Sequence, residues 1–156
     1  MDATVRELID RNEIADLVSR LGVVLDEGRF DEMKSLLAED VTVRTPGGAA
    51  QGPEAVIAQA SRNHRPEQPI QHLITNLLVD LDGDRAAAAR ANLVVHFGAT
   101  DGGAEPTTAP APPVEYTLGE VYRFGLVRAP DGWRFASIET TPLWYFGTPI
   151  GPPRAA

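Results

Sequence analysis

Residues that could exchange protons gather around one stretch of the sequence, residues 71–80, which reads Gln-His-Leu-Ile-Thr-Asn-Leu-Leu-Val-Asp. The stretch is rich in aliphatic and β-branched residues and has neither Gly nor Pro, so it is predicted to be a strand. Side chains alternate along a strand, so His72 and Asn76 share a face with the apolar Ile74 and Leu78. Because a histidine can exchange a proton near neutral pH, this face is either a half-solvated sheet surface or the wall of a pocket.

A hairpin is expected to bring a second histidine close to the first. With residues 82–84 as a three-residue loop, His72 pairs with Val94, and His96 becomes its diagonal neighbour on the same face. The same register adds three further polar residues to that face: Asn76, Arg90 and Asn92. A β-bulge or a longer loop would change this phase.

Asp26 is the carboxylate predicted to partner His72. It follows Leu25 at the end of an amphipathic helix, whose apolar residues recur with the helical period from Ile14 to Leu25. A carboxylate at a helix C-terminus is mildly unfavourable unless it has a partner. A carboxylate that accepts a hydrogen bond from one imidazole nitrogen fixes the tautomer, and the other nitrogen can then take or give a proton. The simpler alternative is a solvated helix-end acid and an ordinary polar residue on a wet strand face.

Helices come first in the sequence and long strands follow, which is typical of an α+β fold with an antiparallel meander. Capping-box spacings at residues 4–7 and 10–13 predict a short helix before the amphipathic one. Further helices are expected at residues 32–38 and from Pro53 onward, and strands are expected at residues 41–44, 71–80, 85–97, 114–128 and 133–146. Residues 1–146 are expected to form one domain, residues 99–113 a mobile loop, and residues 147–156 a flexible tail.

The composition limits the classes of partner. The chain has 156 residues, a formal net charge of −8 and no cysteine. A strongly acidic protein is a poor ligand for nucleic acid or an anionic membrane. No cysteine means no disulfide, no thiolate catalysis and no cysteine-bound zinc. No secretory signal is evident at the N-terminus, so a cytoplasmic location is expected. The hairpin is apolar on both faces, which predicts that helices cover one face and a second copy of the chain the other.

Several segments resemble the nuclear-transport-factor-2-like (SnoaL-like) superfamily. The resemblance lies in residues 21–26, 29–31 and 37–41, in the hairpin around residues 72–76 and 82–86, and in residues 131–137 through Trp144. It implies a curved, mainly antiparallel sheet that forms a cone-shaped half-barrel closed by N-terminal helices. Within the superfamily the sequence looks most like scytalone dehydratase and hexachlorocyclohexane dehydrochlorinase, but it lacks the paired tyrosines of the former, and Leu21 stands at the helix lysine of the latter.

The resemblance implies a cofactor-independent lyase or isomerase, such as a dehydratase or cyclase, that acts on a polyketide, aromatic or steroid-like metabolite. Asp26 and His72 match the catalytic dyad of the two enzymes, and His96 matches a second histidine of scytalone dehydratase. The residues expected to contact the substrate are His96, Asn76, Asn92, Tyr122, Glu120 and Trp144. No cofactor and no metal are expected.

Two alternatives remain open at this stage. The same fold could serve as a non-catalytic module that binds a small molecule or dimerises. Two histidines and a carboxylate, His72, His96 and Asp26, could also form a metal site.

Overall fold

The computed structural model describes residues 2–62, 64–100 and 111–149. The helices are α1 (Ala3–Glu27), α2 (Phe30–Met33), the 3-10 turn η1 (Lys34–Leu36) and α3 (Pro53–Arg62). The strands are β1 (Leu37–Thr45), β2 (Gly48–Gln51), β3 (Ile70–Asp82), β4 (Ala86–Gly98), β5 (Val114–Ala129) and β6 (Gly132–Gly147).

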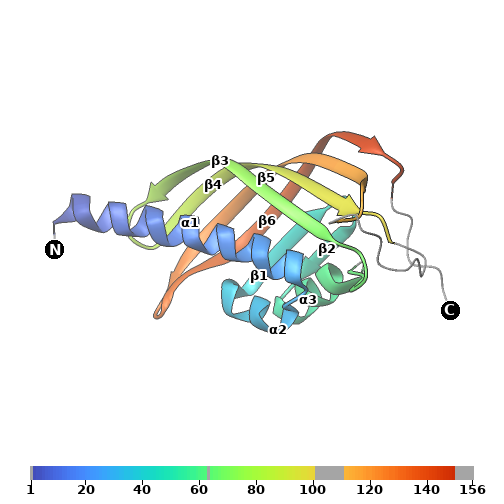
Figure 1. The fold of residues 1–156 in the computed structure, drawn as a ribbon. Coiled ribbons are helices and arrows are strands. Elements are labelled where there is room, and N and C mark those ends of the chain that lie inside the picture. The colour runs from blue at the N-terminus through green and yellow to red at the C-terminus, as the bar shows by residue number, and fades with distance from the viewer. Residues whose placement is uncertain (1, 63, 101–110, 150–156) are drawn as a thin grey trace.

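All six strands belong to one sheet, in the order β2-β1-β6-β5-β4-β3. Only β1 and β6 pair in parallel, and the other neighbours are antiparallel. Figure 1 shows the sheet curving over α1, with α2 and α3 near the C-terminal end of α1. The predicted α+β class and the open, helix-covered half-barrel are confirmed. Most of the segment expected to be a mobile loop, residues 101–110, and most of the expected tail, residues 150–156, lie outside the described residues.

The helical N-terminus differs from the prediction because α1 is one continuous helix of 25 residues. Asp10, which had been read as a capping residue, is buried and faces the β5–β6 hairpin, where it pairs with Arg128 and accepts a hydrogen bond from Trp133 Nε1. The predicted helix over residues 32–38 is also wrong. It is limited to α2 and η1, and β1 already begins at Leu37. Strand β2 had not been predicted.

A β-bulge in β3 changes the predicted register of the central hairpin. Thr75 pairs with Asn92 and Leu78 with Arg90, so two residues of β3 face one residue of β4. Asn76 lies in this bulge with a φ of 53°, a conformation that asparagine tolerates better than most residues. Even-numbered residues of β3 before the bulge therefore share a sheet face with odd-numbered residues after it.

The bulge explains why the hairpin looked apolar on both sides. On the inner face it places five side chains, His72, Ile74, Leu77, Val79 and Leu81, which are all less exposed than their neighbours along β3. A single helix-covered face thus accounts for most of the apolar residues of β3. The predicted second subunit consequently loses much of its support from this hairpin, and it stays a prediction.

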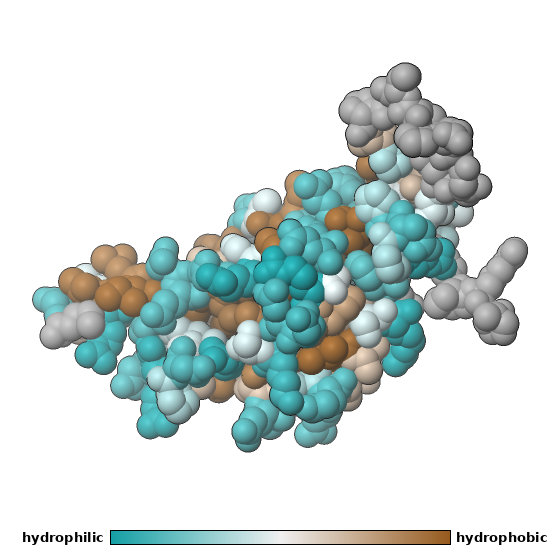
Figure 2. All heavy atoms as spheres, turned by 60° about the horizontal axis from the view of Figure 1, so that its bottom comes forward, coloured by the Kyte–Doolittle hydropathy of each residue, from teal (hydrophilic) through white to brown (hydrophobic). Residues whose placement is uncertain are grey.

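The outer face of the sheet still carries exposed aromatic side chains near the end of β6. Trp144 is 50% exposed and lies flat over Gly119, where a Cβ atom would come within 2.2 Å of the indole. Phe146, on the same face, is 77% exposed. A second group of exposed apolar residues lies at the N-terminal end of α1, where Figure 2 shows hydrophobic atoms at one tip of the molecule: Val5, Leu8 and Ile9.

Close packing of α1 against β3 sets the geometry of the site. Gly22 faces the sheet from the middle of α1, and a Cβ atom there would lie 3.3 Å from Ile74 Cδ1 and 3.9 Å from His72 Cβ. A glycine inside a helix costs about 1 kcal/mol relative to alanine. Its presence here lets the helix approach the strand closely, one turn before Asp26.

Candidate active site

A cavity of about 320 Å³ lies between the inner face of the sheet and the helices. Its wall is mainly apolar and comes from α1, α2, α3 and strands β1, β3, β4, β5 and β6. The apolar lining residues include Leu21, Leu25, Met33, Val43, Val56, Leu93, Val95, Phe97, Leu118 and Ile138. Seven polar side chains interrupt this wall: Thr45, Gln59, Arg62, His72, Glu120, Tyr122 and Thr140. A mostly apolar cavity with a few converging polar groups is the usual form of a small-molecule site.

Asp26 and His72 form a direct pair at this cavity. The Oδ1 atom of Asp26 lies 2.6 Å from Nδ1 of His72, and the two side chains are 24% and 10% exposed. The same Oδ1 atom accepts a hydrogen bond of 2.8 Å from the backbone N–H of His72. Since β3 is the edge strand of the sheet, this second bond satisfies a backbone donor that has no neighbouring strand.

The pair fixes the protonation pattern of the imidazole. A carboxylate accepts hydrogen bonds only, so Nδ1 of His72 carries the proton in the neutral ring. Nε2 is then the unprotonated nitrogen, and it is the atom available to a molecule in the cavity. This arrangement suits a base that takes a proton and passes through an imidazolium form stabilised by Asp26.

Glu120 is a buried carboxyl group on the inner face of β5, two strands away from His72 in the same sheet. It is 7% exposed, and its Oε1 atom is buried without a hydrogen-bond partner among the described residues. Burial raises the pKa of Glu120, while the nearby Thr140 hydroxyl and the His72 ring act in the lowering direction. The Oγ1 atom of Thr140 is likewise buried without a partner in the described part of the chain.

Tyr122 lies on the same inner face, two residues after Glu120. It is 4% exposed and stacks at 4.8 Å between ring centroids on Phe124. Burial raises the pKa of Tyr122, and the negative charges of Glu120 and Asp26 add to this effect. The phenol is therefore uncharged at neutral pH, and can act as a hydrogen-bond donor to an oxygen in the cavity.

The structure separates the remaining predicted contact residues from the cavity. His72 pairs with Val95, and not with Val94 as predicted, because of the bulge at Asn76. His96 therefore projects from the outer face, where its Nδ1 lies 2.9 Å from Thr117 Oγ1.

Asn92, Asn76 and Trp144 also lie away from the cavity. Asn92 pairs with Val121 on the outer face, Asn76 is exposed in the bulge, and Trp144 covers Gly119 on the outer face. Of the eight predicted site residues, the structure brings together Asp26, His72, Glu120 and Tyr122.

Thr140 is a lining residue that the sequence analysis missed. Its strand was predicted, and it pairs with Tyr122, so the strand alternation could have placed the two on one face. The alternative of a three-residue metal site is not assembled, because His96 lies on the other face from His72. Among the described residues, no group of three His, Asp or Glu side chains is close enough to bind a metal ion.

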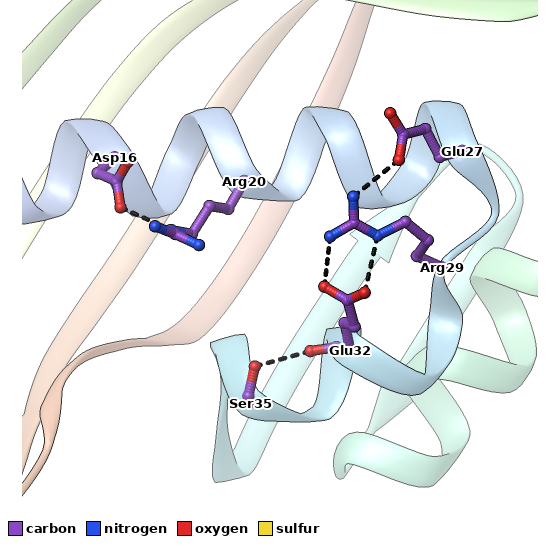
Figure 3. Close-up of polar contacts among 6 residues, drawn as sticks. All are labelled: Asp16, Arg20, Glu27, Arg29, Glu32 and Ser35. Carbon is purple, nitrogen blue, oxygen red and sulfur yellow. Dashed lines mark hydrogen bonds and ion pairs between the residues drawn. The ribbon is translucent and has the colours of Figure 1, made fainter.

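A second hollow of about 650 Å³ lies outside the sheet, between α1, α2 and the β5–β6 turn. Its charged groups largely pair with one another. Figure 3 shows Arg29 between Glu27 and Glu32, at 2.7 and 2.5 Å, and Arg20 bonded to Asp16 at 2.6 Å. These pairs are exposed and compensate each other's charge, so the inner cavity is the better candidate site.

The sequence matches the SnoaL-like domain family over residues 6–139, so this chain belongs to that family. No curated protein matches the sequence.

Solved structures share the fold at low sequence identity. A hexachlorocyclohexane dehydrochlorinase, LinA-type3 from Novosphingobium barchaimii LL02, has a TM-score of 0.76 and 18% identity, with 97% of this chain and 100% of that chain covered. A protein from Novosphingobium aromaticivorans DSM 12444, provisionally assigned as a scytalone dehydratase, has a TM-score of 0.74 and 19% identity, covering 98% and 99%. The function-unknown protein Rv3472 from Mycobacterium tuberculosis has a TM-score of 0.73 and 21% identity, covering 91% and 76%. At these identities the likeness shows the fold alone.

No helix among the described residues is long and apolar enough to cross a membrane.

Proposed function

We propose that this protein is a cofactor-independent lyase or isomerase that moves a proton on an apolar, oxygenated small molecule. The observation that carries the proposal is the 2.6 Å contact between Asp26 Oδ1 and His72 Nδ1 at the wall of a mainly apolar cavity. His72 is the base that removes a proton from a substrate carbon, and Asp26 is the positioning residue that sets its tautomer. Tyr122 binds an oxygen of the substrate.

The size and lining of the cavity limit the substrate. A cavity of about 320 Å³ with apolar walls suits a compact aromatic, polyketide or steroid-like skeleton. Metabolites with several charges fit poorly, because the wall offers few ionisable side chains among the described residues: Arg62, His72, Glu120 and Tyr122. The dehydratase and dehydrochlorinase with the same fold are consistent with an elimination reaction, although each likeness extends to the fold only.

The proposal is tested with β-hydroxy ketones of one and two rings. The purified protein is incubated with each compound, elimination is followed by the absorbance of the conjugated enone, and proton removal by deuterium uptake from D2O. We expect His72→Ala to lower the rate by about 10²–10⁴-fold, the usual contribution of a positioned base. His96→Ala is the matched control, since His96 lies on the outer face and should leave the rate unchanged. Equal rates for His72→Ala and the wild type would refute the proposal.

A non-catalytic binding module of the same fold is the second candidate. The hydrogen bond from the His72 backbone N–H to Asp26 favours this candidate. A carboxylate that accepts from an edge-strand backbone stabilises the fold, so its presence does not require a catalytic role. This candidate predicts that aromatic ketones bind in the cavity without elimination or deuterium uptake. Isothermal titration calorimetry beside the rate assay separates the two candidates.

A further inference from the structure

We propose that Glu120 is the acid partner of His72 and that the group leaving the substrate is a hydroxyl. This inference rests on the proposed function, since it names the second proton-transfer group of the same site.

The first argument is geometric. Glu120 lines the cavity and is only 7% exposed. Its Oε1 atom has no hydrogen-bond partner among the described residues. The hydroxyl of Thr140 also lines the cavity, and it is close enough to Glu120 to lower the pKa of that carboxyl group as a hydrogen-bonding neighbour. A buried carboxyl oxygen without a partner costs free energy, so Oε1 of Glu120 on the cavity wall indicates a polar group of a ligand that bonds it.

The second argument is the position of Glu120 relative to His72, the proposed base. His72 pairs with Val95 on β4, and Val95 pairs with Leu118 on β5, two residues before Glu120 on the same inner face. Two strand spacings of about 4.8 Å separate β3 from β5, so the two side chains can reach neighbouring atoms of one molecule from different sides.

The surroundings of Glu120 favour its uncharged form. The Thr140 hydroxyl on β6 opposes this most strongly, and the His72 ring on β3 opposes it less. Tyr122 is an uncharged phenol, Asp26 on α1 carries a negative charge, and Arg62 of α3 lies at the cavity wall. Burial outweighs the opposing influences and raises the pKa of Glu120. A carboxyl group whose pKa is raised by an apolar site keeps its proton to a higher pH, which suits the role of a proton donor.

The reaction balances with these two groups. Nε2 of His72 takes the proton from a carbon next to a carbonyl, and the electron pair of that C–H bond forms the C=C bond. The C–O bond at the neighbouring carbon breaks, and its oxygen takes the proton of Glu120 and leaves as water. His72 is then an imidazolium and Glu120 a carboxylate. Transfer of one proton from the imidazolium to the carboxylate through water restores the starting state.

The leaving group follows from this arrangement. Hydroxide is a poor leaving group and needs a proton, whereas chloride leaves as an anion without one. A neutral acid in the cavity is therefore useful for eliminating water and of little use for eliminating chloride. This distinguishes the chemistry inferred here from that of a dehydrochlorinase.

The test uses two probes with one skeleton, 4-hydroxy-4-phenylbutan-2-one and its 4-chloro analogue, with the spontaneous rates subtracted. We expect Glu120→Gln, which keeps the shape but cannot give up a proton, to slow elimination from the hydroxy probe by about 10²–10⁴-fold. The same variant should change the rate with the chloro probe by less than about 3-fold, and His72→Ala should slow both probes. Glu115→Gln, an exposed position on the same strand, is the matched control. Equal losses on the two probes in Glu120→Gln would overturn the inference.

A second measurement does not depend on turnover. Infrared difference spectra of the wild type against Glu120→Gln, with glutamate labelled by ¹³C at the carboxyl carbon, report the protonation state of Glu120. We expect the band of a protonated carboxyl group at pH 7, absent from Glu120→Gln and still present in Glu115→Gln. A carboxylate band at pH 7 would overturn the inference even where His72-dependent elimination is intact. If His72→Ala matches the wild type on both probes, the proposed function fails and this inference fails with it.

Discussion

Replacing Asp26 separates its two hydrogen bonds from its charge. Asp26→Ala removes both bonds that Oδ1 accepts from His72, whereas Asp26→Asn keeps an oxygen in that place and removes only the negative charge. The first variant therefore tests the structural role of the side chain, and the second tests its electrostatic role.

The expected losses follow from the two contacts. A hydrogen bond to a charged group contributes about 1.5–3 kcal/mol, and Asp26 is partly solvated, so we take the lower value for each bond. Asp26→Ala should then lower the free energy of unfolding by about 3 kcal/mol. Asp26→Asn should lower it by about 1.5 kcal/mol, since neutral bonds of roughly half that strength remain.

The same variants should differ in turnover. An imidazolium next to asparagine lacks about 1.5–3 kcal/mol of stabilisation, which corresponds to a rate lower by about 10–10²-fold. The measurement combines urea denaturation, ¹⁵N NMR of the His72 ring and the elimination assay with 4-hydroxy-4-phenylbutan-2-one. NMR should show the proton of neutral His72 on Nδ1 in the wild type.

The control is Asp16→Asn on the same helix. Asp16 is 57% exposed and bonded to Arg20, so its loss should cost less than about 0.5 kcal/mol and leave the rate unchanged. The reasoning is refuted if neutral His72 carries its proton on Nε2, or if Asp26→Asn retains the full wild-type rate.

Three further predictions concern stability and packing. Asp10→Ala should lower the free energy of unfolding by about 3 kcal/mol, because it leaves the half-buried Arg128 and the Trp133 indole N–H without the carboxylate that accepts from both; urea denaturation measures this loss. For Glu120, whose pKa is raised above the ordinary 4.5, the folded state binds the proton more tightly than the unfolded state. Its stabilising contribution is therefore complete below about pH 4.5 and declines as the pH rises through the folded-state pKa, by at most about 1.4 kcal/mol per pH unit, and Glu120→Gln should lack this decline in denaturation curves. Gly119→Ala should displace the Trp144 ring, since a Cβ atom would lie 2.2 Å from it, and the tryptophan fluorescence should shift to longer wavelength.

Each of these has a result that would contradict it. For the first, the control is Asp131→Ala, which removes the exposed partner of Arg134. If Asp10→Ala lowered the free energy of unfolding by less than about 0.5 kcal/mol, as expected for this control, the contact of Asp10 would contribute little to stability. For the second, identical pH dependence in the wild type and Glu120→Gln would show that the carboxyl group is not perturbed. For the third, an unchanged emission spectrum would place the indole elsewhere.

The contact between Asp26 and His72 was predictable from the sequence, because the apolar stripe of α1 ends at Asp26, a β-prone stretch begins at His72, and the resemblance to the SnoaL-like enzymes matches both positions. The catalytic role of the pair stays a prediction. Glu120 and Tyr122 were also predictable as neighbours, since residues two apart on a strand share a face.

The position of His96 was not predictable, because it depends on a single extra residue. The hairpin loop has three residues as expected, although it lies at residues 83–85, and this shift alone would have paired His72 with His96 and kept them on one face. The bulge at Asn76 moves the pairing back by one residue, so that His72 pairs with Val95 and His96 lies on the outer face. Asparagine is common in ordinary strand ends and turns, so its presence did not indicate a bulge. Trp144 was misplaced for a similar reason, since β6 is bulged between Pro142 and Trp144.

The two roles of Asp26 are linked by the bulge and by Gly22. Because β3 is an edge strand, the backbone N–H of His72 needs a hydrogen-bond acceptor from outside the sheet. Asp26 of α1 is that acceptor, and the close approach of α1 to β3 at Gly22 brings it within reach. The bulge at Asn76 turns His72 inward, so the same oxygen that satisfies the strand edge also meets the ring nitrogen. The imidazole is thereby oriented by contacts that the folded sheet requires in any case, and this pre-organisation means that little reorganisation is needed when a substrate enters. A loss of Asp26 should therefore reduce both stability and turnover, whereas a loss of the His72 ring, whose backbone bond to Asp26 remains, should reduce turnover far more than stability.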